Sequence, residues 1–397
     1  MRVRRLRLER FGATVATEEP AALLSVDRTL ARRLGADGGA LWDGPPDLTV
    51  LAGPTEVHVA VTERCPATCT GCYADARPDG AEPSLAELLE RLDRVAALGA
   101  FGVAFGGGEA VLRPDLPEVV AHARSLGLVP TLTTSGLGVT SELAAQLTEL
   151  AQVNVSYDGL PGVYEQVRGY AGAEQAERAM RRFAAVGVPV GMNTVLTRDS
   201  FPHLESIAER AAELGVVELQ LLRFKPSGRG TLAYLTTRLS EAQVDAFPAL
   251  LRRLVARHGW KGTPTEPAGG FAIRVDCAMV PLLAADEALR PADLARFGVV
   301  GCEPGRSLMT VDVHGDVRPC SFWRDRPAEP LDSSTWEQDS NLRAFRAFAA
   351  ALPAPCDTCD FAPVCRGGCR IVAATTGDAF AADPECPRVR KLRSPST

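Results

Sequence analysis

The chain contains very little lysine: of its 43 basic residues, only Lys225, Lys261 and Lys391 are lysines. Acidic residues outnumber basic ones, 49 against 43, so the formal net charge is −6. A negative balance argues against a general role in binding nucleic acid or the anionic surface of a membrane. We therefore expect neither a nucleic-acid partner nor a membrane partner.

Long apolar runs are also missing. No uninterrupted run approaches the roughly 20 apolar residues that cross a bilayer. The N-terminus from Met1 to Arg7 is basic, but no apolar segment follows it as one does in a secretory signal. Internal repeats at a fixed period and low-complexity tracts are lacking too. Together these absences predict a cytoplasmic globular protein.

Cysteine, by contrast, is abundant, with 11 residues in a chain of 397. A reducing compartment disfavours structural disulfides, so these cysteines need another explanation. Clustered cysteines in a cytoplasmic chain are typical of metal or redox sites. One cluster lies near residue 70, and the other cysteines lie between Cys277 and Cys386.

Between about residues 55 and 225, short β-rich segments alternate with longer amphipathic ones. One helix is marked by a capping box, Ser84 with Glu87, and by Gly99 at its end, and Thr140 caps a later helix. Six strands, each followed by a helix, predict an α/β fold whose parallel sheet curls into a full or partial (β/α) barrel. Ligands are then expected at the carboxyl ends of the strands. The expected strands are Val57–Val61, Phe101–Phe105, Val129–Thr134, Val153–Tyr157, Val188–Leu196 and Val217–Arg223.

The regions outside this repeat differ in character. In the N-terminal segment, residues 1–52, we expect a strand or hairpin within Val3–Val15 and a short helix over Ser25–Leu34 that starts near Asp27. Residues 236–300 read as a helical linker with a helix from Ser240 to His258. From residue 301 to 397, short segments, turns and cysteines predict a small domain held together by metal, because its apolar core is small.

The first cysteine cluster is Cys65, Cys69 and Cys72, a C-x3-C-x2-C loop directly after the first expected strand. Three thiolates on one tight loop suit three irons of a 4Fe–4S cluster and leave the fourth iron open for another group. A structural zinc site is the alternative, but it needs four ligands, and no fourth lies nearby.

A glycine-rich turn follows the second expected strand: Phe105 is followed by Gly106, Gly107, Gly108 and Glu109. Glycines let the backbone approach a ligand closely, and its carbonyl groups then accept hydrogen bonds from an ammonium group. Taken alone, such a turn is common between a strand and a helix. Its position one βα unit after the cysteine loop makes it a candidate binding site.

These two motifs resemble the radical S-adenosylmethionine (SAM) superfamily, in its C-x3-C-x2-C signature and its GGE motif. The later strand ends at Thr133 to Gly136 and Val155 to Gly159 are similar to those of the family as well. The resemblance covers roughly residues 53–235 and implies a partial (β/α)6 barrel of the TIM type. The SAM contacts that it implies are Gly107, Gly108, Glu109, Ser135, Ser156, Arg168 and Asn193.

The chemistry is implied by the same resemblance. A 4Fe–4S cluster on Cys65, Cys69 and Cys72 gives one electron to SAM, which yields methionine and a 5′-deoxyadenosyl radical that removes a hydrogen atom from the substrate. The electron comes from a donor such as flavodoxin or ferredoxin. This chain departs from the family at Gly71, where an aromatic residue is frequent; Tyr73 is the candidate replacement for packing on adenine.

The later cysteines resemble the SPASM extension of a subset of radical SAM enzymes. The pattern runs C-x12-G-x4-C from Cys302, then C-x2-C-x5-C-x3-C from Cys356, then Cys386. The resemblance implies two auxiliary 4Fe–4S clusters in this domain, and hence three clusters in the chain. It assigns Cys302, Cys320 and Cys369 to the first auxiliary cluster, and Cys356, Cys359, Cys365 and Cys386 to the second.

Cys277 is the one cysteine left over. Either it is the fourth ligand of the first auxiliary cluster, or it is a buried apolar cysteine, as free cysteines often are. In the second case the first auxiliary cluster has an open iron that binds substrate. A zinc ribbon remains the alternative for Cys356 to Cys369, because C-x2-C spacing alone favours zinc.

The resemblance implies a peptide or a small molecule as the substrate partner. The leading hypothesis is modification of a ribosomally synthesised peptide by crosslinking, epimerisation or oxidation. The rivals are a sugar or amino acid as substrate and, outside enzymes, an iron–sulfur electron carrier. Ser321 stands where sulfatase-maturing relatives carry an Asp base, which counts against that activity.

Two further features bear on the substrate. The last strand end places Arg223 and Lys225 near the barrel mouth, either as anchors for a substrate carboxylate or as solvated rim charges. Leu8 to Ala13 faintly resembles the start of PqqD-like peptide-recognition domains. The N-terminal segment is therefore either a truncated peptide-recognition element or a cap over the bottom of the barrel.

Overall fold

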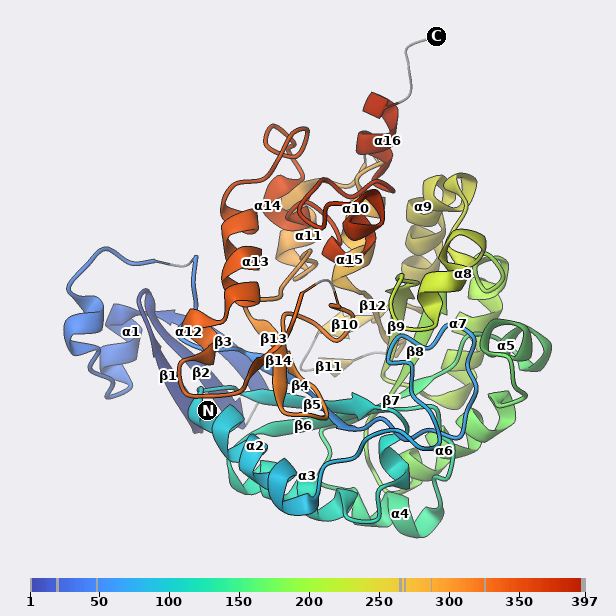
Figure 1. Ribbon diagram of the computed structural model, residues 1–397, viewed down its shortest axis with the longest axis horizontal. Helices are drawn as coiled ribbons and strands as arrows, with labels where there is room; N and C mark the ends of the chain where they lie inside the picture. The colour runs from blue at the N-terminus through green and yellow to red at the C-terminus, as the bar shows by residue number, and fades with distance from the viewer. Residues whose placement is uncertain are drawn as a thin grey trace.

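A ten-stranded sheet lies at the centre of the computed structural model, which describes residues 2–18, 21–47, 49–263, 266–267, 269–286, 288–324 and 326–393 (Figure 1). Strands β4 to β9 are parallel and lie side by side in chain order. This is the arrangement of a partial (β/α)6 barrel. Their bounds are β4 Glu56–Thr62, β5 Gly102–Gly107, β6 Val129–Thr134, β7 Gln152–Ser156, β8 Val190–Leu196 and β9 Glu218–Arg223.

All six predicted strands are confirmed to within a few residues, and so are the helix starts. Ser84 accepts from the Glu87 N–H while the Glu87 side chain accepts from Ser84, which begins the first barrel helix. Thr140 accepts from the Leu143 N–H and begins another. The connecting helices are α2 Leu85–Ala97, η2 Ala110–Leu112, α3 Leu116–Ser125, α4 Ser141–Gln146, α5 Pro161–Arg168, α6 Ala173–Ala185, η3 Phe201–His203 and α7 Leu204–Leu214.

Strands from the later part of the chain extend the sheet at both edges. β12 (Ala272–Val275) pairs in parallel with β9, and β13 (Leu308–Val311) pairs in parallel with β4. β14 (Asp316–Arg318) and β15 (Glu329–Pro330) continue from β13 in antiparallel fashion. Strands of four residues or fewer carry too little periodicity to be predicted. The cysteine-rich domain is thus tied to the barrel by backbone hydrogen bonds.

The region expected as a helical linker contains its predicted helix, α9 (Glu241–His258), with Ser240 at the N-cap, together with β12. The elements around α9 are α8 Gly230–Thr237, β10 Gly262–Thr263, β11 Glu266–Pro267, η4 Cys277–Met279, α10 Val280–Leu283 and α11 Pro291–Arg296. The helices of the C-terminal part are α12 Thr335–Gln338, α13 Ser340–Ala350, α14 Ala362–Cys365, α15 Arg370–Ala373, η5 Ala374–Thr376 and α16 Pro387–Arg393.

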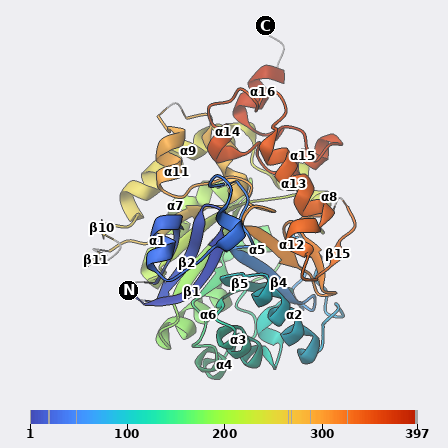
Figure 2. The ribbon, with the colours of Figure 1, turned by 90° about the vertical axis from the view of Figure 1, so that its left-hand side faces the viewer.

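The N-terminal segment forms a separate antiparallel sheet, β1 (Val3–Glu9), β2 (Gly12–Glu18) and β3 (Ala21–Asp27), which faces the viewer in Figure 2. The predicted hairpin is therefore confirmed. The predicted helix is correct only after Asp27, whose side chain accepts from the Leu30 N–H and begins α1 (Arg28–Arg33), because the residues before it belong to β3. The short helix η1 (Gly39–Trp42) follows.

Arginines of β1 join this sheet to the barrel. Arg4 donates to Leu128 O at 3.2 Å, Arg5 to Ala96 O at 2.6 Å, and Arg7 to Pro54 O at 2.6 Å. The accepting carbonyls lie before β4, β5 and β6, so the sheet sits at the amino ends of the barrel strands. Within the described residues, no helix combines the length and apolar character needed to cross a membrane.

Candidate functional site

A cavity of about 270 Å³ lies at the carboxyl ends of the barrel strands. In parallel α/β folds this is the edge of the sheet where ligands bind. The structure brings all ten residues that the sequence predicts for cluster and SAM binding to the wall of this cavity. They are Cys65, Cys69, Cys72, Gly107, Gly108, Glu109, Ser135, Ser156, Arg168 and Asn193.

The segment after β9 holds the cysteine loop in place. Arg229 donates through Nε to Cys69 O at 3.0 Å and through its backbone N–H to Cys72 O at 3.0 Å. Its guanidinium also pairs with Asp75 at 3.0 Å. Gly228 has a φ of +56°, and a Cβ there would lie 2.5 Å from Cys72 O. Arg229 therefore shapes the loop instead of facing the solvent.

The glycine turn packs directly on the end of β4. Gly107 has a φ of +113°, and a Cβ there would lie 2.2 Å from Thr62 O. A Cβ on Gly108 would lie equally close, 2.2 Å, to Arg64 O. Residues with side chains cannot approach a backbone so closely. The two glycines thus fix the turn against the strand that leads into the cysteine loop.

Glu109 is buried in the cavity wall and bound by the end of β6. Its Oε1 accepts from Thr134 Oγ1 at 2.6 Å, and its Oε2 accepts from the Ser135 backbone N–H at 2.8 Å and from the Ser135 hydroxyl. Burial raises the pKa of Glu109, and the hydrogen bonds from Ser135 and Thr134 offset this only in part. The Glu109 carboxyl is therefore held in one orientation at the cavity wall.

Arg168, at the end of α5, pairs with Asp158, with Nε 2.6 Å from Oδ2. Asp158 also accepts from the Val195 N–H at 2.7 Å, which fixes the pair between β7 and β8. Burial lowers the pKa of Arg168, but the charge of Asp158 holds it well above its usual value. Arg168 is thus a fixed cation beside Cys69, whose thiol pKa it lowers against the larger effect of burial.

Ser156 and Asn193 line the cavity from the end of β7 and from β8. Asn193 is only 7% exposed, and its Oδ1 has no hydrogen-bond partner among the described residues. Burying such an oxygen without a donor costs free energy. A hydroxyl or amino group of a bound molecule is a donor that fits this position.

The glycine at position 71, where the family frequently has an aromatic residue, has a steric reason. A Cβ on Gly71 would lie 2.7 Å from Cε2 of Phe224, whose ring occupies the space beside the loop. Tyr73 lines the cavity and packs on Phe322 with ring centroids 4.7 Å apart. Aromatic walls of the cavity therefore come from three separate segments, and packing of adenine on Tyr73 stays a prediction.

Four of the later cysteines form one group. Burial raises the pKa of the Cys277 thiol well above its ordinary value, and the charges of Cys302 and Cys369 add to this effect. Burial likewise raises the pKa of Cys302 to about 12, with Cys369 and Cys320 contributing. Cys277 therefore lies within electrostatic reach of Cys302 and Cys369, and its place as a ligand of the first auxiliary cluster stays a prediction.

The other four form a second group. Burial raises the pKa of Cys356 to about 11, and the charges of Cys386 and Cys359 add to it. Burial also raises the pKa of Cys365, again with contributions from Cys386 and Cys356. The assignment of these cysteines to separate clusters stays a prediction.

The later cysteines are not arranged around the position of one metal ion. In the part of the chain that the structure describes, no three His, Cys, Asp or Glu side chains are arranged as ligands of one metal ion. A zinc ribbon places four ligands around one ion. In a 4Fe–4S cube each thiolate binds a different iron. Whether the later cysteines hold zinc or iron–sulfur clusters stays a prediction.

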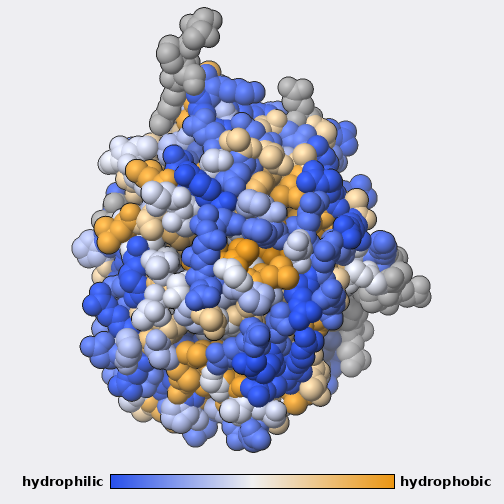
Figure 3. All heavy atoms as spheres, turned by 90° about the vertical axis from the view of Figure 1, so that its right-hand side faces the viewer, coloured by the Kyte–Doolittle hydropathy of each residue, from blue (hydrophilic) through white to orange (hydrophobic). Residues whose placement is uncertain are grey.

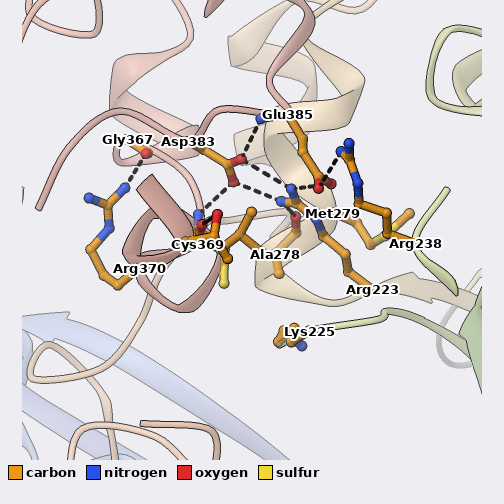
Figure 4. Close-up of polar contacts among 12 residues, drawn as sticks. Arg223, Lys225, Arg238, Ala278, Met279, Gly367, Cys369, Arg370, Asp383 and Glu385 are labelled. Atoms are coloured by element: carbon orange, nitrogen blue, oxygen red, sulfur yellow. Dashed lines mark hydrogen bonds and ion pairs between the residues drawn. The ribbon is translucent and has the colours of Figure 1, made fainter. Parts of the chain in front are cut away.

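Arg223 is buried at the end of β9 and connects the barrel to the cysteine-rich domain (Figure 4). It donates to both carboxylate oxygens of Asp383, at 2.7 and 3.0 Å, and to Glu385 at 2.9 Å. Asp383 in turn accepts from the Cys369 N–H at 2.9 Å. The prediction of a solvated rim charge is wrong for Arg223, whose partners lie inside the protein.

Lys225 lies between the cavity and the first auxiliary group. It is buried, and its Nζ is 2.5 Å from Asp276 Oδ2 and 4.2 Å from the centre of the Phe322 ring. Burial lowers the pKa of Lys225, but the charge of Asp276 and the nearby thiols more than compensate. Lys225 is therefore not a solvated rim charge either; it lines the cavity as one half of an ion pair.

Ser321 contacts a polar chain inside the barrel. Its hydroxyl lies 3.2 Å from His58 Nδ1 and 3.3 Å from Thr310 Oγ1, and His58 Nε2 lies 3.0 Å from Glu56. The position after Cys320, which has no carboxylate in this chain, is thus occupied by a hydroxyl that is held by an imidazole.

Helix α8 borders the cavity and also carries apolar side chains on its outer face. Ala233 and Thr237 line the cavity, whereas Leu232 and Leu235 are 96% and 71% exposed. α8 belongs to the right-hand side of the molecule in Figure 1, and Figure 3 shows that side as mostly hydrophilic with small apolar patches. An apolar surface therefore adjoins the cavity on one side.

Sequence reasoning missed several residues of the site. Asp158 was visible in the strand-end motif, but its ion pair with Arg168 depends on how α5 packs. Phe224 follows the last barrel strand, and the rule that ligands bind at strand ends marks it as a candidate. Phe322 gives no signal in the sequence, because it reaches the cavity from the cysteine-rich domain.

Comparison with known proteins agrees with this geometry. The sequence model of the radical SAM superfamily matches residues 59–211. The chain is 28% identical over 351 residues to the PqqA peptide cyclase of Streptomyces rochei, covering 85% of this chain and 90% of that protein. It is 27% identical to the pre-heme d1 synthase of Dinoroseobacter shibae, covering 82% and 84%.

Among solved structures, the fold resembles Streptococcus suis SuiB bound to the precursor peptide SuiA. The TM-score is 0.72 at 16% sequence identity, and the match covers 96% of this chain and 98% of that chain. Residues 59–211 are thus a radical SAM domain, and the fold of the whole chain, including its N-terminal sheet and cysteine-rich part, is one already known.

Proposed function

Because this chain carries a radical SAM domain, we propose that it is an enzyme that cleaves SAM reductively and modifies a ribosomally synthesised peptide. The observation that carries the proposal is that the three cysteines and all the predicted SAM contacts line one and the same cavity at the strand ends. The similarity to a peptide cyclase over 85% of the chain supports a peptide as the substrate.

The residues of the cavity fit the cofactors that the radical SAM family implies, a 4Fe–4S cluster and SAM. Cys65, Cys69 and Cys72 supply three thiolates and leave one iron position for SAM. The unpaired Oδ1 of Asn193 suits a ribose hydroxyl, and Arg168 suits the carboxylate of SAM. When bound, the cofactors supply a 5′-deoxyadenosyl radical from one electron, which a flavodoxin or ferredoxin delivers; the protein orients them and limits the access of water.

The proposal includes two auxiliary 4Fe–4S clusters, one for each of the two later cysteine groups, so that the chain holds three clusters. Cys277 completes the first auxiliary group, since the charges of Cys302 and Cys369 act on its thiol. Lys225 and Arg223 link this group to the cavity wall. A cluster on the first auxiliary group would lie beside the cavity, where it could accept the electron left on the substrate after hydrogen-atom removal.

We divide the chain accordingly into a radical SAM barrel (53–235), a connecting region (236–300) and a SPASM domain (301–397). The contacts of Arg4, Arg5 and Arg7 at the amino ends of the barrel strands support a capping role for residues 1–52. Recognition of a leader segment by the same residues is the other role, and the substrate experiment below separates the two.

Anaerobic incubation of the reconstituted protein with SAM and dithionite should release 5′-deoxyadenosine. A short peptide encoded beside the gene should be modified under the same conditions, as mass spectrometry can show. Modification that requires the N-terminal leader of that peptide favours peptide recognition by residues 1–52, whereas equal modification without the leader favours a cap. Absence of 5′-deoxyadenosine would refute the enzymatic proposal.

A small molecule is the second candidate substrate, because the chain is almost equally similar to a pre-heme d1 synthase. The exposed leucines of α8 next to the cavity favour the peptide, since they offer an apolar surface to an extended partner. Hydrogen abstraction from a small metabolite, with no modification of the neighbouring peptide, would favour the second candidate.

The spectrum of the first auxiliary cluster tests the role of Cys277. The wild-type chain with three clusters should hold about twelve irons, and a Cys277→Ala variant should keep about the same number if three cysteines still retain the first auxiliary cluster, as three retain a SAM cluster. The electron paramagnetic resonance (EPR) signal of that cluster should change in Cys277→Ala because its fourth iron opens. A signal identical to that of the wild type would show that Cys277 is not a ligand.

A further inference from the structure

Arg370 differs from every other buried cation in the described part of the chain. Four basic side chains are buried there: Arg113, Arg223, Lys225 and Arg370. The first three pair with carboxylates, Arg113 with a distance of 2.7 Å to its partner, Arg223 with 2.7 Å and Lys225 with 2.5 Å. Arg370, only 1% exposed, forms no ion pair with a described residue.

The guanidinium of Arg370 bonds instead to the backbone. It donates to Ala379 O at 3.0 Å, to Ala381 O at 2.7 Å and to Gly367 O, and it lies 3.7 Å from the centre of the Phe348 ring. Its Nε has no partner among the described residues. Figure 4 shows the side chain pointing toward Gly367 and away from the Arg223–Asp383 pair. Carbonyl groups and a ring hold it in place, but they do not neutralise its charge.

The anionic groups that the charge of Arg370 can balance are the thiolates of the two auxiliary cysteine groups. Arg370 follows Cys369 of the first group directly, and its guanidinium donates to Gly367 O, which lies two residues after Cys365 of the second group. Its charge also acts on the thiols of Cys302 and Cys356. One guanidinium therefore lies beside both groups.

Three other cations near these cysteines are already neutralised. Arg366 pairs with Glu303, Arg388 pairs with Asp360, and Lys225 pairs with Asp276. Each of these pairs contributes little net charge at the cysteines. Arg324, near Cys320, also lacks a carboxylate partner among the described residues, but its side chain is exposed. Arg370 is thus the buried cation whose charge remains uncompensated by the described protein.

We infer that Arg370 is the countercharge of both auxiliary iron–sulfur sites and a positioning residue that sets their reduction potentials. The inference rests on the proposed function, because it requires that the two cysteine groups hold clusters. A buried charge is tolerated when an opposite charge lies beside it. Clusters ligated by four thiolates are anionic, and reduction makes them more so, so a nearby cation favours the reduced state.

The test compares three variants of the reconstituted full-length protein. Arg370→Met removes the charge and keeps much of the volume, Arg370→Gln removes the charge and keeps donors for the carbonyls, and Arg370→Lys keeps the charge. The double variant Arg290→Met with Asp293→Asn is the control, because it removes a neutral pair whose side chains are exposed and bond to each other. Iron and sulfide content and redox titrations followed by EPR are measured for each.

In Arg370→Met and Arg370→Gln, the ratio of reduced to oxidised auxiliary cluster at a fixed potential should fall about tenfold, a shift of about 59 mV toward negative values for one electron. The SAM cluster should keep its potential. Arg370→Lys and the control should stay near the wild type. If the uncharged variants instead lose auxiliary iron, Arg370→Lys should retain it.

Two results would overturn the inference. One is an equal effect of Arg370→Lys and Arg370→Met, which would assign Arg370 to packing alone; the other is unchanged potentials in the uncharged variants. If the proposed function itself is wrong, the experiment gives a different result. In that case the wild-type protein itself holds only about four irons, which is the content of a single 4Fe–4S cluster.

Discussion

Replacement of Cys69 by alanine should abolish release of 5′-deoxyadenosine, with a loss of about 10³-fold or more, because the cofactor carries the bond-breaking chemistry. Cys69 lines the cavity, its carbonyl is held by Arg229, and Arg168 lies beside its thiol. Two thiolates on this loop hold a 4Fe–4S cluster poorly, so iron should fall from about twelve to about eight per chain. Coupled chromatography and iron analysis measure both quantities.

The matching control is Asp79→Ala, an exposed position in the same connection between β4 and α2. It should leave both iron content and product release unchanged. A Cys69→Ala protein that keeps about twelve irons would contradict the assignment of this loop to a cluster. A protein that keeps about eight irons and still forms 5′-deoxyadenosine would contradict the assignment of SAM cleavage to the cavity.

The barrel could be predicted from the sequence because its signals are local. Alternating strand and helix patterns, the Ser84 capping box and the helix-ending Gly99 each depend on a few neighbouring residues. The cysteine loop and the glycine turn are local as well. Since carboxyl ends of parallel strands meet at one edge, predicting the strands also predicted which of these motifs would come together.

The connections between domains could not be predicted in the same way. β12 and β13 are too short to show a period, and they are stabilised as strands by pairing with β9 and β4, far away in the chain. The burial of Arg223 depends on its ion pair with Asp383, which lies 160 residues later in the chain. A cation near a strand end looks the same in sequence whether it faces solvent, substrate or a buried carboxylate, because only tertiary packing decides among them.

The second large effect concerns this buried connection. Arg223→Met should lower the free energy of unfolding by about 3–5 kcal/mol, because it leaves the buried carboxylate of Asp383 without its cation. Glu385, by contrast, keeps its pair with Arg238 at 2.7 Å. Asp383 and Glu385 are 1% and 7% exposed, and Asp383 also orients the Cys369 N–H. We therefore expect a lower urea midpoint and, in addition, faster loss of the first auxiliary cluster. Arg253→Met is the control: its pair with Glu205 is exposed and should contribute less than about 1 kcal/mol.

The pH dependence separates the ion pair from simple packing. Burial pushes the pKa of Asp383 up, but the charge and hydrogen bonds of Arg223 bring it below its ordinary value. A carboxyl group with a lowered pKa stabilises the fold above its unfolded-state pKa, near 3.9, and this contribution is lost as the pH falls through the folded-state pKa. In Arg223→Met the burial effect remains without its cation, so the Asp383 pKa there lies above the unfolded value and the variant gains stability as the pH falls through it. The stability difference between wild type and Arg223→Met should therefore be largest at about pH 8 and narrow progressively as the pH falls toward about pH 4. Urea titrations across this range would contradict the ion-pair account if the difference were small at neutral pH or did not change in acid.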